Sequence, residues 1–179
     1  AKQILERRIN EMGLSEPFVQ REGARRIIIE LPGVKDPDEA IKRIGKTAVL
    51  EFKNDQGQTV MTGDDLKDAK EELGQNKQPL VAIELSDEGA KKFADLTSKN
   101  IGRRIAITLD GKELTNPVVQ QAITGGKATI SGSQSLEEAK DLAILLRSGA
   151  LPVKINVLEV RTVGPSLGQD SKDKSVVAF

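Results

Sequence analysis

The spacing of apolar residues is most regular between residues 135 and 160, SLEEAKDLAILLRSGALPVKINVLEV. Apolar side chains recur there at helical spacing, at Leu136, Ala139, Leu142, Ala143 and Leu146. Ser135 and Glu138 form the capping-box pattern that begins a helix, and Gly149 is a residue type that ends one. The β-branched run over 153–160 then predicts a buried core strand. We expect this helix and strand to pack as one unit, mostly on residues more than eighty positions earlier.

Residues 1–53 alternate between helical and strand patterns in a way typical of an α+β domain. The predicted helices cover residues 2–12 and 36–45, and the predicted strands cover 18–21, 25–31 and 48–52. This order is that of a ferredoxin-like fold without its first strand. A later strand could take that place, or the strand could lie outside the chain.

Residues 58–132 carry a second set of elements. Strands are predicted at 80–85, 104–109, 112–114 and 128–131, with a helix that begins at Ser86 and a short helix that Asn116–Pro117 opens. Asp110–Gly111 is a two-residue hairpin signal. Residues 65–73 favour a helix by propensity, yet they also suit a hairpin partner for 80–85, and both options stay open.

These two sets of elements predict a small α+β head inserted into a ferredoxin-like base. The base is expected to comprise residues 1–57 and 133–163, the head residues 58–132, and a Gly-, Ser- and Pro-rich tether residues 164–179. Polar, glycine-containing stretches join the head to the base at both ends. We therefore expect a hinge at Asn54, Gly57, Gly132 and Ser133.

The composition excludes several classes of function. Lys and Arg total 27, Asp and Glu also total 27, and the net charge is zero. With four Phe and no Trp or Tyr, the chain lacks the basic surface and stacking platforms of a nucleic-acid binder. It has no Cys and no His, so thiol catalysis, zinc sites and histidine acid–base chemistry are absent. We expect no enzymatic activity, no cofactor and no metal.

The remaining charged and glycine-rich motifs favour structural roles. Gly125–Gly126 and Ser131–Gly132 lack the surrounding pattern of a phosphate-binding loop. Asp64–Asp65 and Glu71–Glu72 lack the frame of a calcium loop and are predicted to be solvated. Three arginine pairs are likewise predicted to lie on the surface: Arg7–Arg8, Arg25–Arg26 and Arg103–Arg104.

The apolar residues of the insertion leave two interpretations. Candidates for a binding surface are Val60, Met61, Val118, Val119 and Ile123. They either fill the core of the small head or leave an exposed patch that binds unfolded or extended protein.

No run of residues approaches the ~18–20 apolar positions that span a bilayer, and no signal peptide is recognisable. The chain opens at Ala1 inside a predicted helix and closes on KSVVAF. We expect it to be an excised soluble region of a longer protein.

Eight ordered motifs extend over nearly the whole chain: LERRINEMGLSEPFVQREG, IELPGV, TAVLEF, TGDDL, AITLDG, AITGGKATISG, LRSGALP and VGPSLGQDS. With these motifs the chain resembles the large extracytoplasmic domain of the SecD family. Members of that family are membrane subunits that, with SecF, assist protein secretion through the SecYEG translocon.

The resemblance implies a ferredoxin-like base near the membrane and an inserted head, on the extracytoplasmic face of the cell membrane. In the family the domain lies between the first and second transmembrane helices. The head is thought to swing relative to the base and hold unfolded preprotein, driven by the proton-motive force. No catalytic residue is implied, and residues 65–73 are expected to form a hairpin strand.

Two other classes of function compete with this one. The chain could be a small-molecule-binding or enzymatic domain that uses the cleft between head and base, which would need converging polar groups and perturbed carboxylates. It could also be a structural module that docks other membrane subunits through its base.

Overall fold

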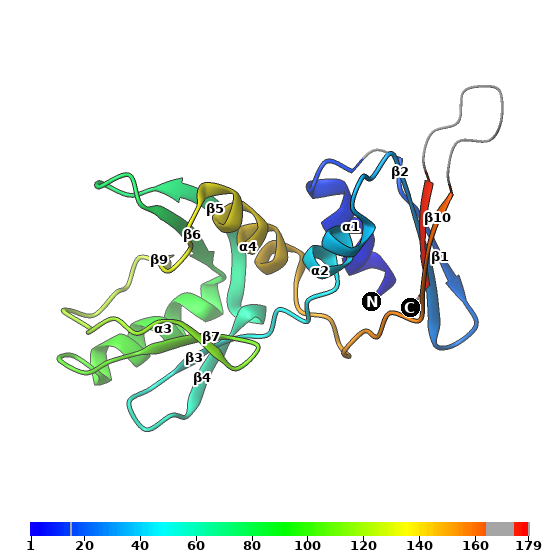
Figure 1. The fold of residues 1–179 in the computed structure, drawn as a ribbon. Helices are drawn as coiled ribbons and strands as arrows, with labels where there is room; N and C mark the ends of the chain where they lie inside the picture. The colour runs from blue at the N-terminus through cyan, green and yellow to red at the C-terminus, as the bar shows by residue number, and fades with distance from the viewer. Residues whose placement is uncertain (15, 164–173, 179) are drawn as a thin grey trace. The chain divides into compact units, whose positions relative to one another are not determined.

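The computed structural model describes residues 1–14, 16–163 and 174–178. The chain divides into two compact units, drawn in Figure 1. Unit 1 comprises Ala1–Thr47 and Leu151–Phe179, and unit 2 comprises Ala48–Ala150. The predicted α+β class is confirmed, because each unit combines helices with antiparallel sheet.

Unit 1 is a four-stranded antiparallel sheet with two helices on one side (Figure 1). Its elements are α1 (Lys2–Glu11), β1 (Phe18–Glu22), β2 (Arg26–Pro32), α2 (Pro37–Ile44), β10 (Glu159–Val163) and β11 (Lys174–Ala178). The strand order is β1-β2-β11-β10, with Ile29 of β2 opposite Val19 on one side and Val177 on the other. Leu5, Ile9 and Ile44 from the helices pack with Ile29 in one core.

The C-terminal part of unit 1 differs from the sequence prediction in two ways. The expected core strand over 153–160 is wrong: only β10 forms there, and Val153 and Leu158 are each 62% exposed. A β-branched run forms a strand only where a neighbouring edge can accept its backbone groups. The expected tether is also wrong in part, because 174–178 form β11 between β2 and β10. Residues 164–173 lie outside the described residues.

Arg8 corrects the prediction that Arg7–Arg8 is a surface pair. Its side chain is completely buried, and its Nη1 donates to the carbonyl oxygens of Ile44 (2.6 Å) and Lys46 (2.5 Å). Ile44 is the last residue of α2, where backbone carbonyls lack partners within the helix. Arg8 therefore satisfies buried acceptors at the C-terminus of α2 from the neighbouring helix α1. Arg7 remains exposed beside Glu11.

Unit 2 holds two antiparallel sheets and two helices. Its elements are β3 (Leu50–Lys53), β4 (Thr59–Thr62), β5 (Leu66–Leu73), β6 (Pro79–Leu85), α3 (Asp87–Lys99), β7 (Ala106–Leu109), β8 (Lys112–Thr115), β9 (Lys127–Ile130) and α4 (Leu136–Ser148). One sheet has the order β4-β3-β7-β8 and the other β5-β6-β9. Both sheets contribute to a single core, in which the rings of Phe52 and Phe93 pack edge to face with their centroids 6.0 Å apart.

The hairpins of unit 2 follow the local signals closely. Asp110 and Gly111 both have positive φ, as the predicted two-residue hairpin turn requires. The Asp110 carboxylate also accepts hydrogen bonds from the backbone N–H groups of Ala48 (3.0 Å) and Val49 (2.9 Å).

Residues 66–73 form a strand rather than a helix. Pairing of Ala69 with Ile83 places both side chains in the core, which outweighs helix propensity.

Helix α4 begins as predicted but belongs to unit 2. The Ser135 Oγ accepts from the N–H of Glu138 at 3.0 Å, while the Glu138 carboxylate accepts from the N–H of Gln134 at 2.6 Å. The helix packs on β5 and β6, and Arg147 Nη1 donates to the Ala69 carbonyl at 2.8 Å. The expected packing on residues more than eighty positions earlier is therefore wrong.

The boundaries between the two units also differ from the expected ones. The chain passes between the units at 47/48 and at 150/151, rather than at 57/58 and 132/133. Helix α4 and β3 both bury their apolar side chains in the core of unit 2. They therefore fold with the inserted segment and not with unit 1.

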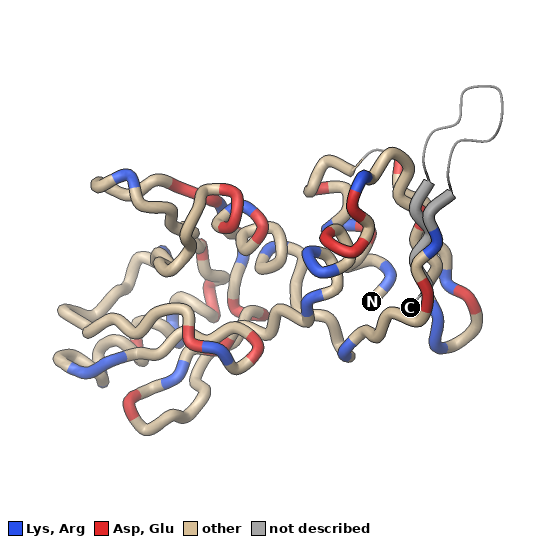
Figure 2. The backbone as a smooth tube through the Cα atoms, viewed as in Figure 1, with Lys and Arg blue, Asp and Glu red and all other residues tan. Residues whose placement is uncertain are grey.

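Charges of both signs are interspersed along each unit (Figure 2).

The pair Asp64–Asp65 departs from the prediction of a solvated surface, because Asp65 is buried. Its carboxylate accepts from the N–H of Thr62 (3.1 Å) and from Lys92 Nζ (3.0 Å). This hydrogen bond and the charge of Asp65 raise the pKa of Lys92 above its ordinary value. Asp65 thus joins the turn after β4 to α3.

Candidate functional site

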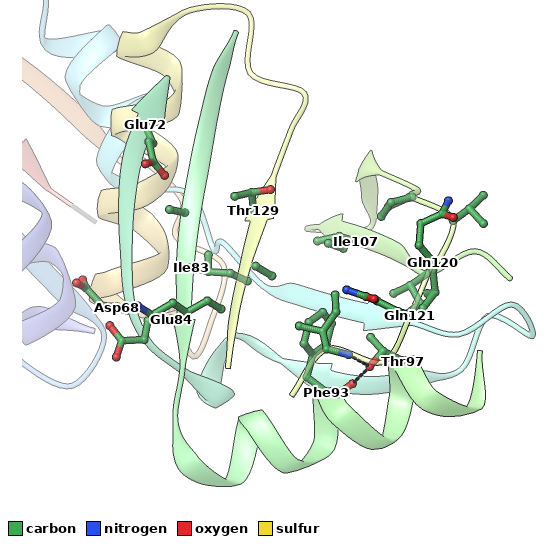
Figure 3. Close-up of a pocket in the computed structure, with 18 of the residues that line it drawn as sticks. Asp68, Glu72, Ile83, Glu84, Phe93, Thr97, Ile107, Gln120, Gln121 and Thr129 are labelled. Atoms are coloured by element: carbon green, nitrogen blue, oxygen red, sulfur yellow. Dashed lines mark hydrogen bonds between the residues drawn. The ribbon is translucent and has the colours of Figure 1, made fainter. Parts of the chain in front are cut away.

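A groove of about 770 Å³ lies within unit 2 and is the candidate site. Strands β6 and β9 form one wall, and β7 with the segment 117–123 forms the other (Figure 3). Helix α3 contributes Phe93 and Thr97 at the base of the groove. The groove lies wholly inside unit 2, so it is not the cleft between head and base that the small-molecule alternative invoked.

The lining of the groove combines apolar and polar side chains. The apolar side chains are Ile83, Phe93, Ile105, Ile107, Pro117, Val118, Val119, Ile123, Ala82 and Ala128. The polar ones are Asp68, Lys70, Glu72, Glu84, Thr97, Gln120, Gln121, Lys127 and Thr129. Such a lining offers a guest both apolar contacts and adaptable hydrogen bonds.

The segment 116–124 is extended, so the predicted short helix is wrong. The N–H of Val119 donates to the Arg103 carbonyl (2.9 Å), and the Pro117 carbonyl accepts from the N–H of Ile105 (3.1 Å). Pro117 is compatible with the first turn of a helix, but the backbone groups here pair with the neighbouring segment 102–105 instead. Isolated bridges join Val118 to Arg104 and Val119 to Ile101.

Thr97 anchors this segment to α3, and sequence analysis did not single it out. Its hydroxyl donates to the Phe93 carbonyl at 2.7 Å and accepts from the N–H of Ile123 at 2.9 Å, as the dashed lines in Figure 3 show. Thr97 is only 1% exposed. A signal was present in the sequence: a hydroxyl residue four positions after Phe93 lies on the apolar face of the helix, where it needs a partner.

Three of the five predicted binding residues line the groove, and two do not. Val118 is 40% exposed there, Ile123 is partly buried and Val119 is buried. Val60 is 37% exposed on β4, away from the groove lining. Met61 is 1% exposed and belongs to the core of unit 2, so it presents no surface to a partner.

The first pair of predicted hinge residues lies in the turn between β3 and β4, inside unit 2. Asn54 and Gln58 close this turn through a backbone hydrogen bond of 3.0 Å, and Asn54 Oδ1 accepts from the N–H of Gln56 and of Gln58. Gly57 supplies the positive φ of the turn. Such a closed turn holds a hairpin together and does not lie at a crossing between the units.

The second pair, Gly132 and Ser133, connects β9 to α4, also inside unit 2. Gly132 has φ +111°, and a Cβ at this position would lie 2.6 Å from the Leu114 carbonyl oxygen. The backbone of β8 therefore approaches Gly132 closely, which explains the glycine by packing. None of the four predicted hinge residues lies where the chain passes between units.

Among the described residues, no cluster of carboxylates is arranged to hold a metal ion. Within the same part of the chain, no helix has both the length and the apolar character needed to cross a bilayer.

Residues 1–153 are covered by matches to two family models. Residues 40–153 match the family model described as "SecDF, P1 head subdomain", and residues 1–57 match "Protein translocase subunit SecDF, P1 domain, N-terminal". The chain belongs to the SecDF P1 domain family. The head match contains the whole of unit 2, including α4.

Relatives named as translocase subunits support this assignment. The chain is 61% identical over 177 residues to the SecD protein of Acidaminococcus fermentans, covering 99% of the chain and 42% of that protein. It is 42% identical over 209 residues to SecDF of Thermus thermophilus, covering 96% of the chain and 28% of that protein. The chain thus spans less than half the length of these relatives.

Two solved structures of SecDF share the fold. One, from work on "a membrane component SecDF that enhances protein export", has a TM-score of 0.82 at 40% identity and covers 90% of this chain and 91% of its own. SecDF in a super-membrane-facing form has a TM-score of 0.83 at 40% identity, covering 88% of this chain and 27% of its own. The resemblance to the SecD family is confirmed, and the family is that of an export component rather than an enzyme.

Proposed function

We propose that the chain is the extracytoplasmic, preprotein-binding part of a Sec export subunit, and that the groove of unit 2 holds extended polypeptide. The observation that carries this proposal is the open groove of about 770 Å³, which is lined by apolar side chains, uncharged amides and charges of both signs. An export component must bind many sequences weakly, so an open groove with many apolar lining residues suits it.

The proposal extends to the setting of the full-length protein. There the chain would lie on the extracytoplasmic face of the cell membrane and work with SecF and the SecYEG translocon. Movement of one unit relative to the other, coupled to the proton-motive force through other parts of the protein, would advance the bound chain. The backbone rotation would then have to occur at the two crossings, 47/48 and 150/151.

Unit 1 is proposed to be the ferredoxin-like base. A ferredoxin-like sheet is antiparallel, with two helices on one face and its first strand between the third and the fourth. In unit 1, β11 occupies that place between β2 and β10, after the other elements in chain order. The first strand that sequence analysis found missing would thus be supplied by the C-terminal strand.

Site-specific crosslinking tests the proposed binding groove. A photoreactive side chain at Val118 should crosslink to a permanently unfolded, carboxymethylated polypeptide, because Val118 lines the groove. Val60 is the matched control: it is also a valine, it is exposed to nearly the same extent (37% against 40%), and it lies outside the groove lining.

Equal yields from the two positions would refute the groove as the binding surface. In the full-length protein, the same pair of positions should distinguish a stalled secretory chain from a folded protein of the same size. Crosslinks to SecF or translocon subunits alone would instead favour the docking module considered among the alternatives.

A further inference from the structure

Among the strands that the structure describes, β9 has no partner at one of its two edges. In the sheet β5-β6-β9 it is the last strand, and among the described strands its hydrogen-bonded neighbour is β6. Near its C-terminal end, the Ser131 hydroxyl lies 3.0 Å from that of Thr115, the last residue of β8 in the other sheet. The unpaired edge therefore runs along the groove and ends where the two sheets meet.

The register of β9 shows which backbone groups face this edge. The N–H of Leu85 donates to the Gly126 carbonyl at 2.8 Å, which marks these two residues as a hydrogen-bonded pair. Antiparallel pairs alternate, so Ala128 exchanges hydrogen bonds with Ile83, whereas Lys127 and Thr129 do not bond to β6. The N–H and C=O groups of Lys127 and Thr129 therefore point away from β6, towards the unpaired edge.

Free space adjoins these groups. Lys127, Ala128 and Thr129 all line the groove. Figure 3 shows Thr129 on one side of it, with Gln120 and Gln121 on the other. Among the described residues, the two glutamine side chains take part in none of the hydrogen bonds found, and both residues are exposed. Their amides can donate and accept on the side of a guest chain that faces away from β9.

We propose that polypeptide binds this groove by strand addition, as a fourth strand paired with β9. This inference rests on the proposed function and specifies its chemistry. Main-chain hydrogen bonds to Lys127 and Thr129 are available to every sequence except proline, which explains how one site accepts many chains. The four residues of β9 extend ~13 Å, so the paired length is short and the binding is correspondingly weak.

The side chains of the guest divide between two environments. In a strand, successive side chains point to opposite faces of the sheet. One set faces the apolar interior, near Ile107 and Val119, and the other faces the charged surface of β5 and β6 that carries Asp68 and Glu84. Segments that alternate apolar and polar residues should therefore bind better than uniformly charged ones.

Proline substitution in β9 tests the backbone contact without removing any groove side chain except that of Thr129. Thr129→Pro deletes an N–H that points away from β6, a position where an edge strand tolerates proline. We expect this variant to keep its fold and to bind a short peptide of alternating Val and Ser about tenfold more weakly, the effect of one lost hydrogen bond. Thr129→Val keeps the N–H and should bind as the wild type does.

The reciprocal change is made in the peptide. N-methylation of every residue removes its donors on both edges without altering the side chains, and we expect this peptide to lose detectable binding to the wild-type chain. The experiment with the N-methylated peptide tests strand addition even if Thr129→Pro does not fold. Binding that is unaffected by N-methylation would overturn strand addition while leaving the groove as a side-chain site. Absence of binding by the unmodified peptide would instead refute the proposed function.

Discussion

Replacing Arg8 by Met should destabilise unit 1 far more than replacing its neighbour Arg7 by Met. The two residues are adjacent in the sequence and identical in type, but Arg8 is 0% exposed and donates to two backbone carbonyls at the end of α2. Arg7 is exposed and contacts Glu11 at 3.3 Å. Methionine retains most of the apolar length of the side chain, so the comparison isolates the guanidinium group.

The expected loss of unfolding free energy in Arg8→Met follows from the hydrogen bonds that Arg8 makes. A hydrogen bond from a charged donor contributes about 1.5–3 kcal/mol, and a buried carbonyl left without a partner costs about 1–3 kcal/mol. The Ile44 carbonyl becomes such a group in Arg8→Met, so we expect a loss of about 3 kcal/mol. An exposed ion pair within a helix contributes about 0.3–0.5 kcal/mol, which sets the effect of Arg7→Met.

Hydrogen exchange measured by mass spectrometry resolves the effect within unit 1. A loss of about 3 kcal/mol should accelerate exchange of protected amides in α2 and β2 by about a hundredfold, while peptides from unit 2 serve as the internal reference. Arg7→Met should leave exchange nearly unchanged. If the two variants exchange alike, Arg8 does not stabilise the end of α2 despite its burial.

Two further predictions concern unit 2. Gly132→Ala should destabilise unit 2 by about 2–4 kcal/mol, because a positive φ and contact with the Leu114 carbonyl each oppose a Cβ. A Cβ at Gly125 would meet open space, so Gly125→Ala is the control and should leave the free energy of unfolding in urea nearly unchanged. Asp65 raises the pKa of Lys92 in the folded state. The stabilisation that the Lys92–Asp65 pair gives the folded state is therefore complete below the ordinary Lys pKa of 10.5, and it is lost as pH rises through the folded-state pKa. Lys92→Met should thus be less stable than the wild type at pH 7, and the difference should shrink in unfolding measured at increasingly alkaline pH.

Local signals predicted those features whose causes lie within a few residues. The capping of α4 by Ser135 and the positive-φ turn at Asp110–Gly111 were both confirmed, because each depends on neighbouring backbone groups. The end of α2 at Gly45 was confirmed for the same reason. The eight ordered motifs also identified the family, which the matches to its head and N-terminal models confirm.

The candidate groove was only partly predictable. Val118, Val119 and Ile123 were named as binding candidates and all three line the groove, but the short helix that was predicted to carry them does not form. Thr97 holds their segment in an extended conformation from twenty-six positions earlier in the chain. No local pattern around Pro117 reveals a partner at that distance.

By itself, the sequence determined the α+β class, most element boundaries and the family, since these follow from periodicity, caps, turns and motifs. Only the tertiary structure decided that α4 belongs to unit 2, that Arg8 and Asp65 are buried, and that β11 completes the sheet of unit 1. The physical reason is that burial and strand pairing depend on surfaces supplied by distant residues. A helix face or a strand edge specifies that it needs a partner, but not which segment of the chain will provide one.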